Sequence, residues 1–435
     1  MICVARSFRI AVFAIVVALT SSTSPARPAG KAEKVGIPTA LPGKGMVSNG
    51  VDVLVEEKFK SLKGLRIGLI TNHSGTDRDR NHLIDLLIKA PGVKLKALFS
   101  PEHGIRGESD STISDGIDAQ TGLPVYSLFG KRPPREPADT YIQRVFETRK
   151  PKPEHLAELD ALVFDIQDIG CRFYTYVSTM GLCMEAAKDA GIRFIVLDRA
   201  NPINGVAVQG PVQDYPISFI GFHDTPLRHG MTVGELARMF NEEKKIHVNL
   251  TVIPLRNWKR DLWFDQTGLP WINPSPNIRN LNQAILYPGV GVIEGANISV
   301  GRGTDTPFEV VGAPYIDGVR LAADLNDFKL EGVRFEPIRF TPTSTKFPRK
   351  ECGGVRIVLM DRNRCNAVDV GLAIAQAVYR LYPEDFDIDR LQRHLGHPPT
   401  LSILKSGKSL AEIRQTWSAK LEEFEQRRSR YLLYN

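Results

Sequence analysis

Residues 161–170 carry the sequence Ala161-Leu162-Val163-Phe164-Asp165-Ile166-Gln167-Asp168-Ile169-Gly170. The first four side chains form an uninterrupted apolar run, which is typical of a strand buried on both faces of a parallel sheet. An amide and two carboxylates follow directly. The stretch therefore predicts a parallel sheet that is buried on both faces, and it predicts the edge of that sheet at which a ligand binds.

Similar apolar runs recur through the first half of the chain and alternate with helix-like segments. Strands are expected at 65–72, 93–100 and 193–197, and helices at 82–90, 179–190 and from Thr232 to about residue 243. Buried strands that alternate with helices predict an α/β fold with a mostly parallel sheet.

Polar side chains follow the end of each of these strands. They are Asn72, Glu102, His103, Asp165, Gln167, Asp168 and Asp198. A single acidic residue in such a place is often a helix cap or a loop anchor. Several polar groups from four strands that converge on one edge are typical of a ligand site.

The glycine pattern argues against a dinucleotide as that ligand. The first strand is followed by Asn72-His73-Ser74-Gly75, not by a G-x-G-x-x-G turn. Gly289, Gly291 and Gly295 resemble that fingerprint, but they lie far downstream and their spacing is wrong. No P-loop sequence occurs, and no cofactor is expected.

The second half predicts a smaller α/β domain. An edge strand is expected at 248–254, a further strand at 355–360, and helices at 320–326, 368–381 and 410–431. We therefore expect a first domain at 46–243 and an auxiliary domain at 244–435. The ligand site is expected in the cleft between them.

One loop of the second half concentrates polar chemistry. Its candidate ligand-binding residues are Glu294, Asn297, Ser299, Arg302, Thr304 and Glu309. Glycines on both sides of Arg302 let the backbone bend tightly and approach a ligand. The composition suits an anionic, hydroxyl-rich small molecule, although a solvated loop would have similar residues.

The N-terminus predicts export to the periplasm or the extracellular space. Basic residues, an apolar run and small residues over 1–26 form a signal-peptide pattern, and 27–45 is expected to be a flexible leader. Loss of Arg6 and Arg9 on cleavage would lower the formal charge from +7 to +5. No nucleic-acid motif and no transmembrane segment after the signal are expected. The oligomeric state is left open.

The sequence leaves two questions open, namely whether the cysteines form disulfides and what role the histidines have. In an oxidising compartment one or two disulfides could form, or the thiols could be isolated and buried; the residues concerned are Cys171, Cys183, Cys352 and Cys365. His223, Asp224 and His229 lie close together in sequence, and such side chains can bind zinc. No HExxH motif accompanies them, so we favour a structural or substrate-contact role over a metal site.

Several long motifs resemble one known family. They are Pro101-Glu102-His103-Gly104, the 165–176 stretch, His229-Gly230-Met231-Thr232, Ser275-Pro276-Asn277, the 294–309 loop and Gly312-Ala313-Pro314. Together they are similar to the exo-β-N-acetylmuramidases of the NamZ family, glycoside hydrolase family 171. The resemblance implies a Rossmann-like domain with an auxiliary domain. It also implies an exported enzyme that removes N-acetylmuramic acid from the non-reducing end of peptidoglycan fragments.

Glycoside hydrolysis needs an acid and usually a second group. Glu102 is the expected acid, because it lies at the strand-end edge. Glu294, Asp165 and Asp168 compete for the second role, with Tyr174 as a further candidate. The separation of the carboxylates, and with it a retaining or inverting outcome, does not follow from the sequence.

Arg302 is expected to bind the lactyl carboxylate of muramic acid, helped by Arg172, because a planar guanidinium suits a carboxylate. Asn277, Asn297 and Ser299 are expected at sugar hydroxyls or the acetamido group. The complete set of expected substrate-binding residues is Asn72, His103, Gln167, Arg172, Tyr176, His229, Asn277, Asn297, Ser299, Arg302, Thr304 and Glu309.

Two other classes of function remain open at this level. A secreted muropeptide- or sugar-binding protein would share the cleft but would not need an acid such as Glu102. A metal-dependent amidase or carbohydrate esterase would use His103, His223, His229 and the aspartates, and chelators would inhibit it.

Overall fold

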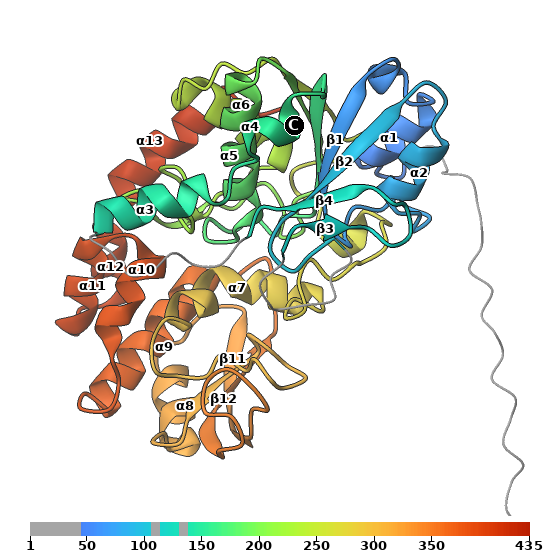
Figure 1. Cartoon of the computed structure of the whole chain (residues 1–435). Coiled ribbons are helices and arrows are strands. Elements are labelled where there is room, and N and C mark those ends of the chain that lie inside the picture. Colours follow the sequence, from blue (N-terminus) through green and yellow to red (C-terminus); the bar gives the residue numbers. More distant parts are fainter. Residues whose placement is uncertain (1–44, 106–113, 130–137) are drawn as a thin grey trace, which may run out of the picture. The chain divides into compact units, whose positions relative to one another are not determined.

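The computed structural model describes residues 45–105, 114–129 and 138–435 of the 435-residue chain. The expected export signal, 1–26, lies outside the described residues, as does the expected leader except for its last residue. Residues 44–435 form one compact unit, and Figure 1 labels many of its helices and strands. Within the described ranges, no helix has both the length and the apolar character needed to cross a membrane.

The first half is built on a seven-stranded sheet with the order β3–β4–β2–β1–β5–β6–β9. Its strands are β1 (Arg66–Thr71), β2 (Lys94–Ser100), β3 (Gly116–Ile117), β4 (Pro124–Ser127), β5 (Ala161–Asp165), β6 (Arg193–Leu197) and β9 (Leu250–Ile253). Every neighbouring pair is parallel except β3 with β4. The predicted mostly parallel sheet is confirmed. The edge strand expected at 248–254 is β9, which belongs to this sheet, while the boundary drawn at residue 243 stays a prediction.

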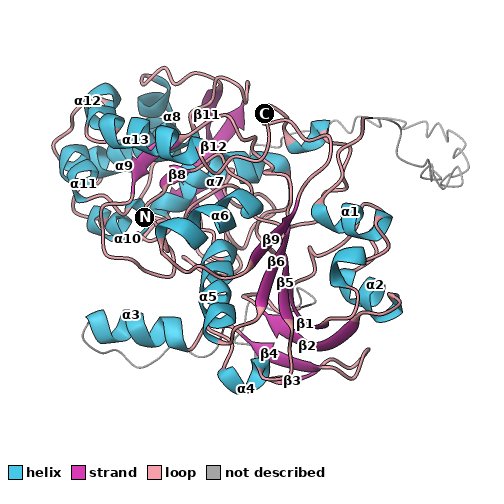
Figure 2. Ribbon diagram, turned by 90° about the horizontal axis from the view of Figure 1, so that it is seen from above, coloured by secondary structure: helices cyan, strands magenta, loops and turns pink. Residues whose placement is uncertain are grey.

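The helices of this half are α1 (Gly50–Glu56), η1 (Lys60–Leu62), α2 (Leu83–Lys89), α3 (Ala138–Glu147), α4 (Pro153–Leu156), α5 (Tyr176–Asp189) and α6 (Val233–Glu243). They bury both faces of the sheet, because successive side chains of a strand point to opposite sides. Leu162 and Phe164 of β5 join the apolar cluster that contains α5 and α6. Ala161 and Val163 join the one that contains α1 and α2. Figure 2 shows these helix pairs on opposite sides of the sheet.

The second half has a small antiparallel sheet of order β10–β12–β11. Its strands are β10 (Val310–Ala313), β11 (Val333–Phe340) and β12 (Cys352–Leu359). A separate antiparallel pair lies earlier in the chain and consists of β7 (Gln209–Val212) and β8 (Pro226–Arg228). The remaining helices are η2 (Phe264–Gln266), α7 (Leu281–Ile293), α8 (Gly318–Asn326), α9 (Ala367–Leu381), η3 (Ile388–Leu391), α10 (Gln392–Leu395), α11 (Pro398–Lys405), α12 (Leu410–Gln415) and α13 (Ser418–Ser429). The expected second, smaller α/β layer is therefore present.

Helix α7 has no counterpart in the sequence prediction. It contains Pro288, Gly289 and Gly291, residues that usually argue against a helix. It forms because it is buried on all sides and packs closely against α9. A Cβ on Gly289 would lie 1.7 Å from the carbonyl oxygen of Ala367. Gly289 and Gly291 thus lie inside a closely packed helix and not in a strand-to-helix turn.

The single amphipathic helix predicted for 410–431 is wrong. Two helices, α12 and α13, occupy the segment and meet at Thr416 and Trp417. The Thr416 hydroxyl donates to the carbonyl oxygen of Ile413 at 2.7 Å, which helps to end the first helix locally. Trp417 is 4% exposed, so burial of its ring favours the change of direction.

The four cysteines of the described chain are separate, buried thiols. Cys171 and Cys183 lie in the first half and Cys352 and Cys365 in the second. The sequence left disulfides and isolated buried thiols open as alternatives. The structure has isolated buried thiols.

Candidate active site

The loops that follow β1, β2, β5 and β6 meet at one edge of the sheet, because these strands are parallel. The polar residues predicted at the strand ends therefore share that edge. The structure divides them between a closed, buried network and an open cavity.

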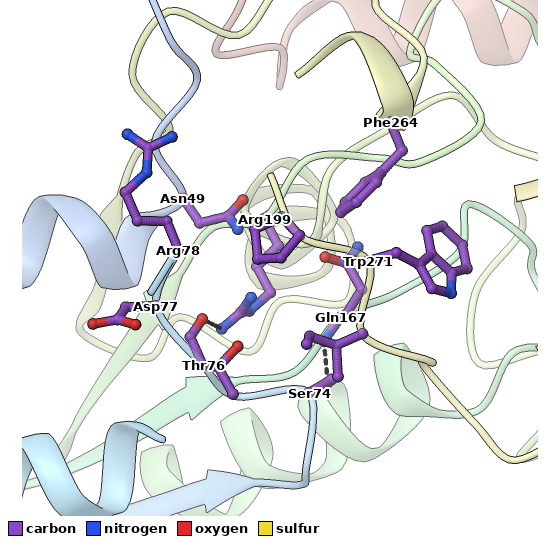
Figure 3. A pocket seen from close by; sticks show the side chains of 11 residues that line it. Asn49, Ser74, Thr76, Asp77, Arg78, Gln167, Arg199, Phe264 and Trp271 are labelled. Atoms are coloured by element: carbon purple, nitrogen blue, oxygen red, sulfur yellow. Dashed lines mark hydrogen bonds between the residues drawn. The ribbon is translucent and has the colours of Figure 1, made fainter. Parts of the chain in front are cut away.

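The closed network is centred on an ion pair between Arg199 and Asp165. Nε of Arg199 lies 2.6 Å from Oδ1 of Asp165, and a terminal nitrogen lies 2.9 Å from Oδ2. The same nitrogen donates to the carbonyl oxygen of Thr76, a bond drawn in Figure 3. The cavity left beside Arg199 measures about 20 Å³, room for about one water molecule. Asp165 thus lies in a structural ion pair and not on the wall of a substrate-sized site.

Asn72 and Gln167 belong to the same network. Oδ1 of Asn72 accepts bonds from the backbone nitrogen and the hydroxyl of Ser74, at 2.9 and 2.6 Å. Nε2 of Gln167 donates to the carbonyl oxygens of Asp168 and Ala200, at 2.7 and 2.9 Å. The structure places both amides where they hold loops together.

Asp168 and His229 form a second buried pair. Oδ2 of Asp168 accepts the Gly170 N–H at 2.7 Å and lies 3.8 Å from Nε2 of His229. Nδ1 of His229 accepts the Met231 N–H at 3.1 Å. Burial raises the pKa of Asp168 to about 7 and lowers that of His229 to about 3. Both groups are therefore mostly neutral between about pH 3 and pH 7, and neither lines the two chambers described below.

The open cavity begins with an inner chamber of about 330 Å³, which is the size of a small-molecule site (roughly 300–1,000 Å³). Its walls come from the loop after β2, the residues before α5, helix α7, the 294–309 loop and α10. Six of the residues predicted for the site line it: Glu102, His103, Tyr174, Tyr176, Glu294 and Arg302. Both halves of the chain thus contribute, as the predicted cleft requires.

Glu102 stands on a tight turn that directly follows β2. The next residue, His103, has a φ of 70°, and Gly104 has a φ of 80°. A non-glycine residue in the left-handed region is uncommon and is often found at functional sites. Thr175 Oγ1 donates a 2.7 Å hydrogen bond to Oε2 of Glu102. The turn and this bond fix the carboxyl group in the chamber wall.

Glu294 caps the end of α7 and pairs with Arg302. Nε of Arg302 lies 2.5 Å from Oε1 of Glu294, and its guanidinium lies 5.4 Å from the ring centre of Phe308. Gly301 and Gly303 adopt φ values of 78° and 82°, so the tight bend predicted around Arg302 is confirmed. The chamber therefore presents a second carboxylate whose charge is offset by a fixed guanidinium.

The other polar residues of this loop bond to the protein itself. Oγ of Ser299 accepts the Gly301 N–H, and the Thr304 hydroxyl donates to the Gly301 carbonyl oxygen. Asn297 bonds to the backbone of the 385–387 segment. Oε1 of Glu309 accepts from Asn280 and Gln283 of the α7 start. The structure places these four side chains in the scaffold of the loop, outside the chamber walls.

Arg172, predicted as a helper in carboxylate binding, is 3% exposed. Its two terminal nitrogens donate to four backbone carbonyl oxygens, those of Pro211, Thr225, His394 and Leu395. The guanidinium thus ties the first half to α10 and lies off the chamber wall. Asn277 is half-buried between Ser275 and Ile278, two residues that do line the chamber.

Tyr174 and Tyr176 present a pair of rings, 5.1 Å apart and nearly perpendicular. Burial raises the pKa of Tyr174 well above its usual range, so its phenol stays protonated and is a poor nucleophile. The Tyr176 hydroxyl donates to the carbonyl oxygen of Pro274 at 3.1 Å. Both rings suit contact with a sugar face.

A larger outer chamber, about 780 Å³, adjoins the inner one. Phe129, Phe146 and Phe219 give it an aromatic lining, and Arg149 lies 3.8 Å from the ring centre of Phe219. The residues that line both chambers are Glu102, Thr175, Gly295 and Arg393. The expected acid therefore stands at the boundary between a small polar chamber and a wide aromatic one.

The histidine cluster considered for a metal has other bonds. Nε2 of His223 lies 2.6 Å from Oε2 of Glu243, and His229 bonds as described above. In the ranges that the structure describes, no group of three or more His, Cys, Asp or Glu side chains is arranged to hold a metal ion.

The wall residues that the predicted site set lacks include Thr175, Tyr287 and Arg393. Thr175 lay inside a recognised motif but was passed over for its tyrosine neighbours. Tyr287 sits on the unpredicted α7. Arg393 lies on α10, a four-residue helix with no polar motif around it. Only the first carried a signal in the sequence, namely its place beside a strand-end carboxylate motif.

Residues 67–282 match the family model described as Exo-beta-N-acetylmuramidase NamZ, N-terminal, and residues 285–434 match the corresponding C-terminal model. The chain is 43% identical over 397 residues to the peptidoglycan beta-N-acetylmuramidase NamZ of Bacillus subtilis (strain 168). That match covers 90% of this chain and 92% of the relative.

Two solved structures of DUF1343 family proteins from Bacteroides fragilis NCTC 9343 share the fold. The first has a TM-score of 0.80 at 37% identity and covers 90% of this chain and 100% of its own. The second has a TM-score of 0.68 at 30% identity and covers 89% and 99%.

Proposed function

We propose that this chain, which belongs to the NamZ family of exo-β-N-acetylmuramidases, is a glycoside hydrolase that releases N-acetylmuramic acid from the non-reducing end of peptidoglycan fragments. The observation that carries the proposal is the position of Glu102 on the wall shared by the two chambers. A glycosidic oxygen lies between the sugar that is released and the group that leaves. The acid that protonates it must therefore stand between their two sites.

The inner chamber suits the terminal sugar. It is small, polar and lined by tyrosine rings, whereas the outer chamber is wide enough for the rest of the glycan. A sugar held in a chamber of one-residue size can only be the last of a chain, which is the condition for exo action. The aromatic lining of the outer chamber can stack on the leaving sugar.

In the proposed reaction Glu102 donates its proton to the glycosidic oxygen as the bond from that oxygen to the anomeric carbon breaks. Positive charge then develops at the anomeric carbon and its ring oxygen. Glu294 is the second carboxylate of the inner chamber, and we assign to it the stabilisation of that charge. Arg302 holds Glu294 in place through their ion pair. Addition of water to the anomeric carbon completes hydrolysis and returns a proton to the protein.

We further propose that the protein is exported and acts in cell-wall turnover. The support is the signal-peptide pattern over residues 1–26 and a substrate class that lies outside the cytoplasmic membrane. Detection of the mature protein, without residues 1–26, in a periplasmic or culture fraction tests this proposal. Full-length protein confined to the cytosol would contradict it.

The activity is tested with two disaccharides that differ only in order. One has N-acetylmuramic acid at the non-reducing end, and the other has N-acetylglucosamine there. We expect release of free N-acetylmuramic acid from the first disaccharide and no cleavage of the second. Mass spectrometry of the products measures both outcomes. Cleavage of both, or of internal bonds in longer glycans before terminal ones, would overturn the exo-muramidase assignment.

A further inference from the structure

One arginine on the chamber walls has a guanidinium group that no described residue binds. Arg393 lines both chambers, is exposed, and makes no ion pair or hydrogen bond within the described part of the chain. The neighbouring cations differ: Arg302 pairs with Glu294 at 2.5 Å, and Arg390 pairs with Asp387 at 2.5 Å. Among these three arginines, Arg393 alone presents a guanidinium that a ligand can take up without breaking an existing pair.

The backbone that carries Arg393 is held firmly. The buried Arg172 donates to the carbonyl oxygens of His394 and Leu395 at 3.0 and 2.7 Å, and Gly396 ends α10 in the left-handed conformation. The His394 ring packs edge-on against Phe173, with ring centres 5.4 Å apart. A fixed backbone with an unbonded head group is what a preorganised ligand contact requires.

A second polar group beside Arg393 also lacks a partner. Nδ1 of His394 is buried without a hydrogen bond in the described ranges, and His394 lines the inner chamber. A Cβ on Gly295 would lie 3.2 Å from this nitrogen, so the glycine leaves the space beside it open. Buried polar atoms in native proteins nearly always have a partner. The unpaired nitrogen is therefore available to a polar group of a ligand in the inner chamber.

We propose that Arg393 binds the lactyl carboxylate of the muramic residue in the inner chamber and thereby sets the preference for muramic acid over glucosamine. The inference rests on the proposed function and deepens it. An N-acetylglucosamine ring carries no charge, whereas muramic acid adds one carboxylate. A guanidinium binds a carboxylate through two parallel bonds, and Arg393 has all its donors available, unlike Arg302, which Glu294 already holds.

The test compares two substrates that differ only in that charge. They are the 4-nitrophenyl glycoside of β-N-acetylmuramic acid and the same glycoside with its lactyl carboxylate as the methyl ester. In Arg393→Gln we expect kcat/KM for the acid to fall about 10- to 100-fold, the cost of a charged hydrogen-bond pair. The ester should lose less than about threefold. Arg393→Lys, which keeps the charge but not the fork, should fall between Gln and wild type.

Matched controls separate charge from structure. Arg390→Gln makes the same change three residues away, and it should leave the acid-to-ester ratio as in wild type. Arg302→Gln should reduce turnover of both substrates alike, because it disturbs Glu294. If the ester is turned over too slowly to measure, competitive inhibition by free N-acetylmuramic acid and by N-acetylglucosamine replaces it. Arg393→Gln should then weaken only the former inhibitor, about 10- to 100-fold.

An equal loss for acid and ester in Arg393→Gln, or no loss for either, would overturn the role of Arg393. A selective loss for the acid in Arg302→Gln would transfer that role to Arg302. Failure of the wild-type protein to hydrolyse the muramic glycoside would instead refute the proposed function, so the two failures are distinguishable.

Discussion

Thr175 Oγ1 donates a 2.7 Å hydrogen bond to Oε2 of Glu102 and joins the start of α5 to the loop after β2. Oε1 of Glu102 makes no hydrogen bond within the residues that the structure describes. One carboxyl oxygen is thus held by Thr175, and the other is the one left for the proposed proton transfer. In the proposed reaction, this bond fixes the orientation of the carboxyl group that delivers the proton.

Loss of this bond should slow catalysis more than binding. Thr175→Val has nearly the same volume but no hydroxyl, and we expect kcat to fall about tenfold while KM changes little. Thr175→Ser should keep most of the activity. Steady-state kinetics on the muramic acid–glucosamine disaccharide, whose leaving sugar needs the acid, measure both. A rise in KM with unchanged kcat would mean that Thr175 contacts the sugar and does not position Glu102.

The pKa of Asp168 makes the stability of the fold depend on pH. Burial raises that pKa to about 7 from a value of 3.8 in the unfolded chain. Between these values the folded state holds a proton that the unfolded state releases, so stability falls as pH rises from about 4 through 7. Above pH 7 the buried carboxylate is charged, and this charge lowers the free energy of unfolding by as much as about 4 kcal/mol.

Asp168→Asn imitates the protonated form and should remove this dependence. Its amide oxygen can still accept the Gly170 N–H. We expect the variant to match the wild type at pH 4 and to unfold at a higher temperature at pH 8. His229, whose pKa is lowered to about 3, stays mostly neutral over this range and does not offset the difference. A variant less stable than wild type at pH 8 would show that a charged Asp168 is favourable.

The C-terminus is anchored at the same sheet edge. The Tyr434 hydroxyl lies 2.5 Å from Oδ2 of Asp198 and accepts the Leu255 N–H at 2.9 Å. Tyr434→Phe should cost about 1–3 kcal/mol, because a buried carboxyl and a backbone N–H each lose a partner. The edge-on contact with Trp258 remains possible in the variant. Urea unfolding checks this, and an unchanged midpoint would show that the hydroxyl is replaced by water.

The sheet and its functional edge followed from the sequence because both depend on short-range patterns. The apolar run at Ala161–Phe164 needs cover on both faces, which only a helix-flanked sheet provides. Parallel strands then bring their carboxyl ends together whatever the details of the loops. Glu102 reached the inner chamber for this reason, because it follows β2. Glu294 and Arg302 reach it from the end of α7, which the sequence did not predict, and the signal for them was their polar, glycine-rich loop.

The separation of Asp165 from Glu102 did not follow, because it depends on a partner distant in sequence. Asp165 is closed off by Arg199, 34 residues away, and nothing near Asp165 predicts that pair. Arg393 was missed because no polar motif surrounds it, and its lack of an ion pair also depends on a residue distant in sequence. Asp389 precedes it by four residues, a spacing that suggests an ion pair on a helix. Nζ of Lys405 lies 2.9 Å from Oδ1 of Asp389 instead, and Arg393 is left without an ion pair among the residues that the structure describes.

Comparison of two leaving groups in Glu102→Gln tests the central claim most directly. A nitrophenolate leaves without protonation, whereas a saccharide alkoxide needs an acid. We predict that kcat/KM for the muramic acid–glucosamine disaccharide falls about 10²- to 10⁴-fold in the variant, and that the 4-nitrophenyl glycoside loses far less. Equal losses for both substrates, in a variant that unfolds at the wild-type temperature, would contradict the assignment of Glu102 as the acid.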